Sequence, residues 1–192
     1  MRNIAVFDFD GTITQKDTLF EFLKFTHGWR YYINLLILSP VLIAFKLKLI
    51  KNYRAKQILF SLFYKEWDID TFNSFCADFA SKIKIRPKAL DAIKKHSEKG
   101  DIIVIASASI ENWIYPWSSE YNIDHVLATR IEVIHGKITG KFFGKNCFGQ
   151  EKVNRISEVF PTRTNYYLTA YGDSRGDKEL LEYANESYLN KF

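Results

Sequence analysis

The amino-acid sequence predicts an α/β fold in which a parallel sheet is interrupted by an all-helical insertion. Largely apolar runs, each typical of a strand buried on both faces, occupy residues 4–7, 102–106 and 166–171. Between the first and second runs, residues 14–85 show helical periodicity without an evident strand. We therefore expect residues 1–13 and 86–192 to form the core and residues 14–85 to form a helical cap subdomain.

The first strand leads directly into a pair of acids, Asp8 and Asp10, and then into Gly11. On a continuing strand the two carboxylates would share one face, about 7 Å apart. Gly11 allows the backbone to turn sharply after them. The carboxyl ends of buried parallel strands are where α/β sheets place ligands, so this context favours a functional site over two solvated acids.

Three more strand ends or helix starts in the core carry candidate groups. The strand at 102–106 ends in Ser107, with Ser109 two residues on, and these hydroxyls either cap a helix or hold an anion there. Gly149 opens a helix whose first turn carries Lys152, an electrostatically unfavourable place for a cation. The strand at 166–171 leads into an acidic loop at 172–177, and strands at 126–134 and 137–143 form a hairpin.

Composition excludes several classes of function. The net charge of +5 is mildly basic, and no Lys/Arg block is interleaved with aromatic residues, so we expect no nucleic-acid partner. Cys76 and Cys147 form neither a metal pattern nor a disulfide framework, which is typical of a cytoplasmic protein. Because a strand begins at the N-terminus, we expect no signal peptide.

The insertion should hold about four helices, the first capped by Asp17. Its residues 31–45 carry no charge, and five basic residues follow by position 56. Three interpretations stay open for this stretch. It forms a pair of core helices broken near Pro40, it docks on a membrane with its basic residues at the headgroups, or it spans a bilayer. A span would normally need about 20 apolar residues.

The segment 8–14, DFDGTIT, resembles the first motif of the haloacid dehalogenase (HAD) superfamily, most of whose members are phosphohydrolases. Ser107, Lys152 and the G-D-x-x-x-D pattern at 172–177 match its other three motifs in order. The resemblance spans nearly the whole chain and implies the Rossmann-like HAD fold. The helical insertion is similar to subfamily IB, and segments 106–109 and 149–153 are similar to the phosphatidylglycerophosphatase C branch. Ser174 stands where phosphoserine phosphatases usually have glycine.

This resemblance implies a Mg²⁺-dependent phosphatase of phosphoric monoesters. Asp8 would attack phosphorus and form an aspartyl-phosphate, and Asp10 would protonate the leaving oxygen and then activate water. Lys152 and Ser107 would hold the phosphate oxygens, with Ser109 as a second candidate for this contact.

The same resemblance implies a metal site. The Asp8 side chain, the Asp10 backbone carbonyl and Asp173 would bind Mg²⁺, which prefers such hard oxygen ligands. Thr12 and Asp177 would support these groups, and Asp177 would orient either Lys152 or a metal-bound water. The second aspartate, Asp10, argues against a dehalogenase and against a non-catalytic phosphate-binding module.

The substrate is less determined. Asp17 lies where phosphoserine phosphatase has its amine-binding glutamate, and Arg54 is a candidate partner for a substrate carboxylate. The uncharged run followed by basic residues instead favours a substrate with an apolar portion, of phospholipid type, and peripheral membrane contact through residues 31–56. Phosphoserine phosphatase and phosphotransferase activities remain as alternatives.

Overall fold

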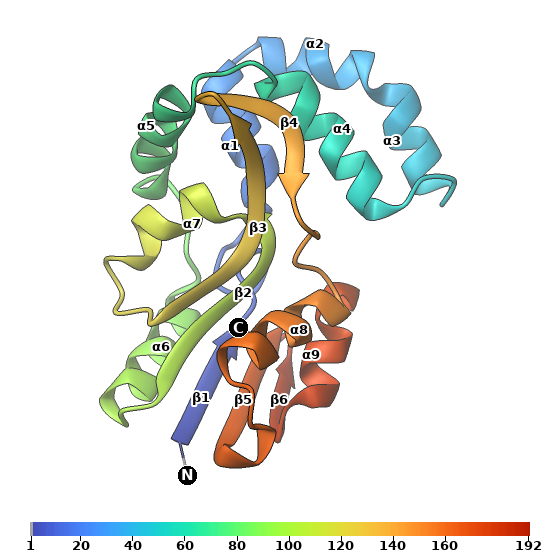
Figure 1. The fold of residues 1–192 in the computed structure, drawn as a ribbon. Coiled ribbons are helices and arrows are strands. Elements are labelled where there is room, and N and C mark those ends of the chain that lie inside the picture. The colour runs from blue at the N-terminus through green and yellow to red at the C-terminus, as the bar shows by residue number, and fades with distance from the viewer. Residues whose placement is uncertain (1) are drawn as a thin grey trace.

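The computed structural model describes residues 2–192, so residue 1 of the expected core lies outside the described part. Six strands form one sheet in the order β4-β3-β2-β1-β5-β6 (Figure 1). All neighbouring strands pair in parallel except β3 and β4, which are antiparallel. The strands are β1 (Arg2–Phe7), β2 (Ile102–Ile110), β3 (His125–Ile134), β4 (Lys137–Phe143), β5 (Tyr166–Gly172) and β6 (Glu186–Leu189). The predicted parallel α/β fold is confirmed.

Strand β1 lies in the centre of the sheet, between β2 and β5, as its apolar run requires. Alternate side chains of β1 belong to two different apolar clusters: Ala5 and Phe7 to one, and Ile4 and Val6 to the other. The helices of the core cover these two faces, with α6 and α7 contributing to the first cluster and α8 and α9 to the second. These helices are α6 (Pro87–Glu98), α7 (Glu111–Ser118), α8 (Gln150–Val159) and α9 (Lys178–Tyr183).

The second strand is longer than its sequence pattern indicated. Instead of ending at residue 106, β2 continues to Ile110, with a register shift against β3 between Ser107 and Ile110. Pairing with β3 keeps this segment in the sheet, while the irregularity re-aims its side chains. The serine-containing segment is therefore a bulged strand end and not a loop.

Five helices, one more than expected, occupy the insertion: α1 (Thr18–His27), α2 (Arg30–Ile37), α3 (Ser39–Lys46), α4 (Asn52–Tyr64) and α5 (Ile69–Ala80). Phe22 of α1 joins them to the core, because its ring lies 4.8 Å from that of Trp113 in α7. The β3–β4 hairpin extends from the sheet to the insertion, where Phe142 contacts Phe60 of α4 (Figure 1). The insertion therefore rests on both a core helix and a hairpin.

The uncharged stretch forms a broken pair of helices, α2 and α3, but this pair is not buried. Neither helix contains a fully buried residue, although Leu38 between them is buried, and Tyr31 and Leu35 pack partly against the cluster. Of the interpretations left open for this stretch, burial in the cap core therefore does not apply to most of its side chains. Within residues 2–192, no helix is both long and apolar enough to cross a membrane.

Candidate active site

The four motifs meet at the carboxyl edge of the sheet, where β1, β2 and β5 end and α8 begins. A cleft of about 520 Å³ lies there between the sheet and the inserted helices. Its core-side walls include six polar groups from the motifs: Asp8, Asp10, Ser107, Lys152, Asp173 and Asp177. Its cap-side walls combine an apolar group, Leu19, Phe20, Leu42, Phe45, Ala55 and Leu59, with the polar residues Gln15, Lys16, Asp17, Asn52 and Lys56.

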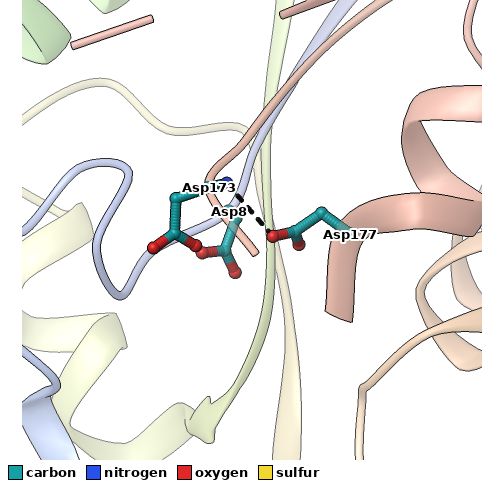
Figure 2. A group of neighbouring side chains, drawn as sticks. All are labelled: Asp8, Asp173 and Asp177. Atoms are coloured by element: carbon teal, nitrogen blue, oxygen red, sulfur yellow. Dashed lines mark hydrogen bonds between the residues drawn. The ribbon is translucent and has the colours of Figure 1, made fainter. Parts of the chain in front are cut away.

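Three carboxylates converge at the sheet edge (Figure 2). Asp8 directly follows β1, and Asp173 and Asp177 lie in the loop after β5. One oxygen of each lies within 4.8 Å of the others. Desolvation, and next the charge of Asp177, raise the pKa of Asp173. This concentration of hard oxygen donors and negative charge fits Mg²⁺.

Gly11 provides the space for the carboxylate of Asp173, an expected metal ligand. Its φ of +79° is in the region that favours glycine, and a Cβ there would lie 2.0 Å from Asp173 Oδ2. The turn after β1 thus packs its bare Cα against the loop after β5. Asp10, the other expected metal ligand through its carbonyl, lines the same cleft beside Gly11.

A buried ammonium group links the nucleophile candidate to the acidic loop. Lys152 Nζ donates to Asp8 Oδ1 and to Asp177 Oδ1, each at 2.5 Å. Burial alone would lower the pKa of Lys152, but the two carboxylates outweigh it and raise the pKa, so the lysine stays charged. Desolvation raises the pKa of Asp8 to about 7 against the opposing effect of Lys152. The two acids also offset the unfavourable helix dipole at the start of α8.

The second oxygen of Asp177 organises the loop that carries Asp173. It accepts hydrogen bonds from the backbone N–H groups of Asp173 at 3.2 Å (Figure 2) and Ser174 at 3.1 Å. Ser174 Oγ also donates to it at 3.1 Å. The serine that departs from the usual glycine is thus part of the loop structure. A Cβ on Gly172 would lie 2.5 Å from the Asp177 Cβ, so this packing needs glycine.

Asp10 is held by hydrogen bonds from two elements. Its Oδ1 accepts from the backbone N–H of Thr18 at 2.8 Å and from Thr18 Oγ1 at 2.7 Å, and its Oδ2 accepts from Ser109 Oγ. Trp113 Nε1 donates to Thr18 Oγ1 at 3.0 Å. Sequence reasoning missed Thr18 and Trp113. Thr18, next to the capping residue Asp17, carried a weak signal, and no spacing pointed to Trp113.

The two serines of β2 have different surroundings. Ser107 lines the cleft, and its Oγ accepts a hydrogen bond from the Ser109 N–H at 3.0 Å. Ser109 is buried and turned towards Asp10, so its placement differs from the expected contact with substrate. The register shift in β2 gives the physical reason, because the bulge rotates the side chains that follow Ser107.

On the cap side, Lys56 occupies the place expected for Arg54. Arg54 is exposed and is not among the residues lining the cleft. Lys56 lines it and donates to the Ala108 carbonyl at 2.5 Å. Residues two apart on a helix point about 200° apart, so only one of this pair can face the cleft. Desolvation lowers the pKa of Lys56, with Asp10 opposing the effect most strongly.

Two sequence candidates remain, Asp17 and Thr12, and they differ in their access to the cleft. Asp17 lines the cleft and caps α1 by accepting a hydrogen bond from the Leu19 N–H at 2.9 Å. Desolvation by the cleft walls, and then the charge of Asp10, raise the pKa of Asp17. Thr12 is buried behind Gly11, and within residues 2–192 its hydroxyl has no hydrogen-bond partner.

Comparison with known proteins gives the family. A model of the haloacid dehalogenase-like hydrolase family matches residues 5–182. The chain belongs to this family. It is therefore an enzyme of the hydrolase class, and its relatives include phosphatases.

The relatives cover most of the chain. Protein CicA of Caulobacter vibrioides is 34% identical over 188 residues, covering 95% of this chain and 83% of that protein. The histidinol-phosphatase of Neisseria meningitidis serogroup C is 23% identical over 204 residues, covering 97% and 89%. A solved phospho-aspartyl intermediate analogue of phosphoserine phosphatase superposes with a TM-score of 0.68 at 18% identity, covering 97% and 85%. This structural likeness confirms the HAD fold.

Gly11→Ala should weaken the affinity for Mg²⁺, because the added Cβ displaces the Asp173 carboxylate. Disturbing a group that supports a metal ligand typically costs 10- to 100-fold, so the Mg²⁺ concentration for half-maximal phosphate release should rise by at least about tenfold. Gly100→Ala is the matched control, since Gly100 has a similar φ of +74° but nothing within 4 Å of its Cβ position. Both variants should lose roughly 1–2 kcal/mol of unfolding free energy from backbone strain. Equal Mg²⁺ dependence in the two variants would contradict this role of Gly11.

Proposed function

We propose that this protein is a Mg²⁺-dependent phosphomonoester phosphatase that acts through an aspartyl-phosphate on Asp8. The observation that carries the proposal is the buried Lys152 bridging Asp8 and Asp177, next to an acid cluster that opens on the cleft. An unpaired Asp8 would repel a phosphate dianion. The neighbouring ammonium and a cation at the acid cluster would offset that repulsion.

Asp8, Asp173 and the Asp10 carbonyl would hold Mg²⁺. When bound there, the ion would neutralise charge on the phosphoryl group. The Asp8 carboxylate then attacks phosphorus, the bond to the substrate oxygen breaks, and the aspartyl-phosphate forms. Ser107 Oγ and Lys152 Nζ stabilise the non-bridging oxygens as their charge changes.

Asp10 transfers the proton in both half-reactions. Its carboxyl gives a proton to the leaving oxygen and then takes one from the water that hydrolyses the intermediate. The hydrogen bonds from Thr18 and Ser109 fix its orientation, and Trp113 in turn fixes the Thr18 hydroxyl. Thr18 and Trp113 are thus positioning residues for Asp10.

The substrate that we propose carries an apolar portion, as a phospholipid-type monoester does. Leu42 and Phe45 of α3 and Leu59 of α4 line the cleft opposite the acids. Burying a methylene against such walls contributes about 0.8 kcal/mol. A peripheral membrane contact through residues 31–56, in the cytoplasm, suits this substrate class because such a monoester resides in a bilayer.

Phosphoserine phosphatase is the second candidate, favoured by Asp17 and Lys56. These oppositely charged groups both line the cleft, where they could pair with an amine and a carboxylate. The solved relatives include phosphoserine phosphatases, although at sequence identities that establish only the fold. The apolar cap wall favours the amphiphile, since a small zwitterion would leave that wall in water.

Asp10→Asn should slow hydrolysis selectively for substrates with poor leaving groups. Loss of one acid–base catalyst costs about 10²- to 10⁴-fold, and an alkyl phosphate should show the larger loss because its alkoxide needs a proton. p-Nitrophenyl phosphate should lose less in the first half-reaction. Asp173→Asn is the control, since loss of a metal ligand should affect both substrates alike. Equal losses for both substrates in Asp10→Asn would remove Asp10 from the acid role.

The activity should rise with the length of an n-alkyl phosphate. Each added methylene should raise kcat/KM by up to about fourfold, at 0.8 kcal/mol each, until the apolar wall is covered. Leu42→Asn should flatten this trend, and Leu36→Asn, an exposed leucine outside the cleft lining, should leave it unchanged. A flat chain-length series together with high activity on phosphoserine would favour the second candidate.

A further inference from the structure

We infer that the outer face of α2 and α3 docks on an anionic lipid bilayer and holds the mouth of the cleft at the headgroups. The inference rests on the proposed function in one respect, that the substrate is an amphiphile drawn from the same bilayer. The docking face comprises the exposed apolar side chains between residues 29 and 49 other than Phe45, which lines the cleft: Trp29, Tyr32, Ile33, Leu36, Ile37, Ile43, Leu47 and Leu49.

The side chains of the docking face are largely exposed to solvent. Leu36 is 73% exposed, Leu49 76% and Trp29 68%. Single exposed leucines are common, but here exposed apolar side chains recur from Trp29 to Leu49. This segment comprises α2, α3 and the turns beside them, and the two helices lie at the outer edge of the molecule (Figure 1). A concentration of exposed apolar side chains of this kind marks an interaction surface. An interfacial helix pair that lies in the headgroup region exposes its apolar residues in this manner.

The positive charge around the docking face favours an anionic partner. Residues 22–65 contain eight Lys or Arg and no Asp or Glu, whereas the whole chain has a net charge of +5. The rest of the molecule is therefore net negative. Exposed basic residues flank the docking face, among them Arg30, Lys46, Lys48 and Lys51. Each basic residue near an anionic membrane contributes attraction, whereas a second copy of this face would bring like charges together.

The docking face and the cleft share helix α3. Helix α3 carries Leu42 and Phe45 in the cleft wall and Ile43 on the docking face. One helix therefore borders both the bilayer contact and the phosphatase cleft. An acyl chain that leaves the bilayer along α3 would stay against apolar side chains until its phosphate reaches the acids at the sheet edge. A small water-borne substrate gains nothing from this arrangement.

Vesicle co-sedimentation tests the docking independently of catalysis if it uses the full chain with Asp8→Asn. Vesicles of phosphatidylcholine with about 30% phosphatidylglycerol should bind the protein, and pure phosphatidylcholine vesicles should bind it at least about tenfold more weakly. Leu36→Glu with Ile43→Glu should reduce binding to the anionic vesicles by about tenfold or more. Leu189→Glu is the matched control, because Leu189 is a 59% exposed leucine on β6, away from this face.

Charge variants separate the two contributions. Lys46→Gln with Lys48→Gln should weaken binding to anionic vesicles and make the remaining binding less dependent on salt, whereas Lys88→Gln with Lys95→Gln on α6 should change neither. Circular dichroism and hydrolysis of p-nitrophenyl phosphate, measured on the same variants with Asp8 restored, should match the wild type. If the protein carrying Leu36→Glu and Ile43→Glu binds vesicles as well as the Leu189→Glu protein does, the docking proposal is wrong, whether or not the protein is an active phosphatase.

Sedimentation velocity tests whether a second copy of the chain, and not a bilayer, covers the docking face. The protein without vesicles should be monomeric at micromolar concentration, and the Leu36→Glu, Ile43→Glu variant should not differ from it. A dimer that this variant dissociates, in a protein that ignores anionic vesicles, would assign the face to a second copy of the chain and overturn the proposal. Vesicle binding without any phosphatase activity would leave the docking intact and overturn the proposed function.

Discussion

The site depends on one buried ammonium group. Lys152 joins the end of β1, through Asp8, to the loop after β5, through Asp177. A buried charge is costly unless it is paired, so these two carboxylates and the lysine are mutually required. The sheet order makes the contact possible, because β1 and β5 are neighbours and end at the same edge. The helix that carries Lys152 packs over the adjoining face.

This constraint also explains why the acid cluster is compact. Asp177 uses one oxygen for Lys152 and the other for the backbone of its own loop, which fixes Asp173 beside Gly11. The carboxylates are therefore held close together although their charges repel. A divalent cation bound there would relieve that repulsion, as the proposed function requires.

The inserted helices complete the site from the opposite side. Their aromatic cluster is continuous with the core through Phe22 and Trp113, and the same Trp113 supports Thr18 and Asp10. Packing of the insertion is thus linked to the orientation of Asp10, the proposed acid–base group. The apolar side chains of α2 and α3 that do not pack in this cluster remain exposed. Their contact with water is unfavourable, and contact with a lipid surface, as proposed above, would remove it.

Much of the core could be predicted from the sequence, because its signals are local. Each buried strand is a short apolar run, and the acids, the serine and the lysine follow at fixed positions. The bulge in β2 could not be predicted, since it depends on pairing with β3, and Ser109 was therefore expected to face the cleft. Lys56 was overlooked in favour of Arg54 because the choice depends on the rotation of α4 about its axis. The support of the insertion by the β3–β4 hairpin depends on contacts distant in sequence, such as Phe60 with Phe142.

The most direct measurement of the central claim is to trap the covalent intermediate. Wild-type protein mixed with substrate and Mg²⁺ is quenched in acid within its first turnovers, and its peptides are analysed by mass spectrometry. The account predicts one hydroxylamine-sensitive phosphoryl group on Asp8, with none on the protein carrying Asp8→Asn and no turnover by that variant. A phosphoryl group on another residue, or full turnover by Asp8→Asn, would contradict the account.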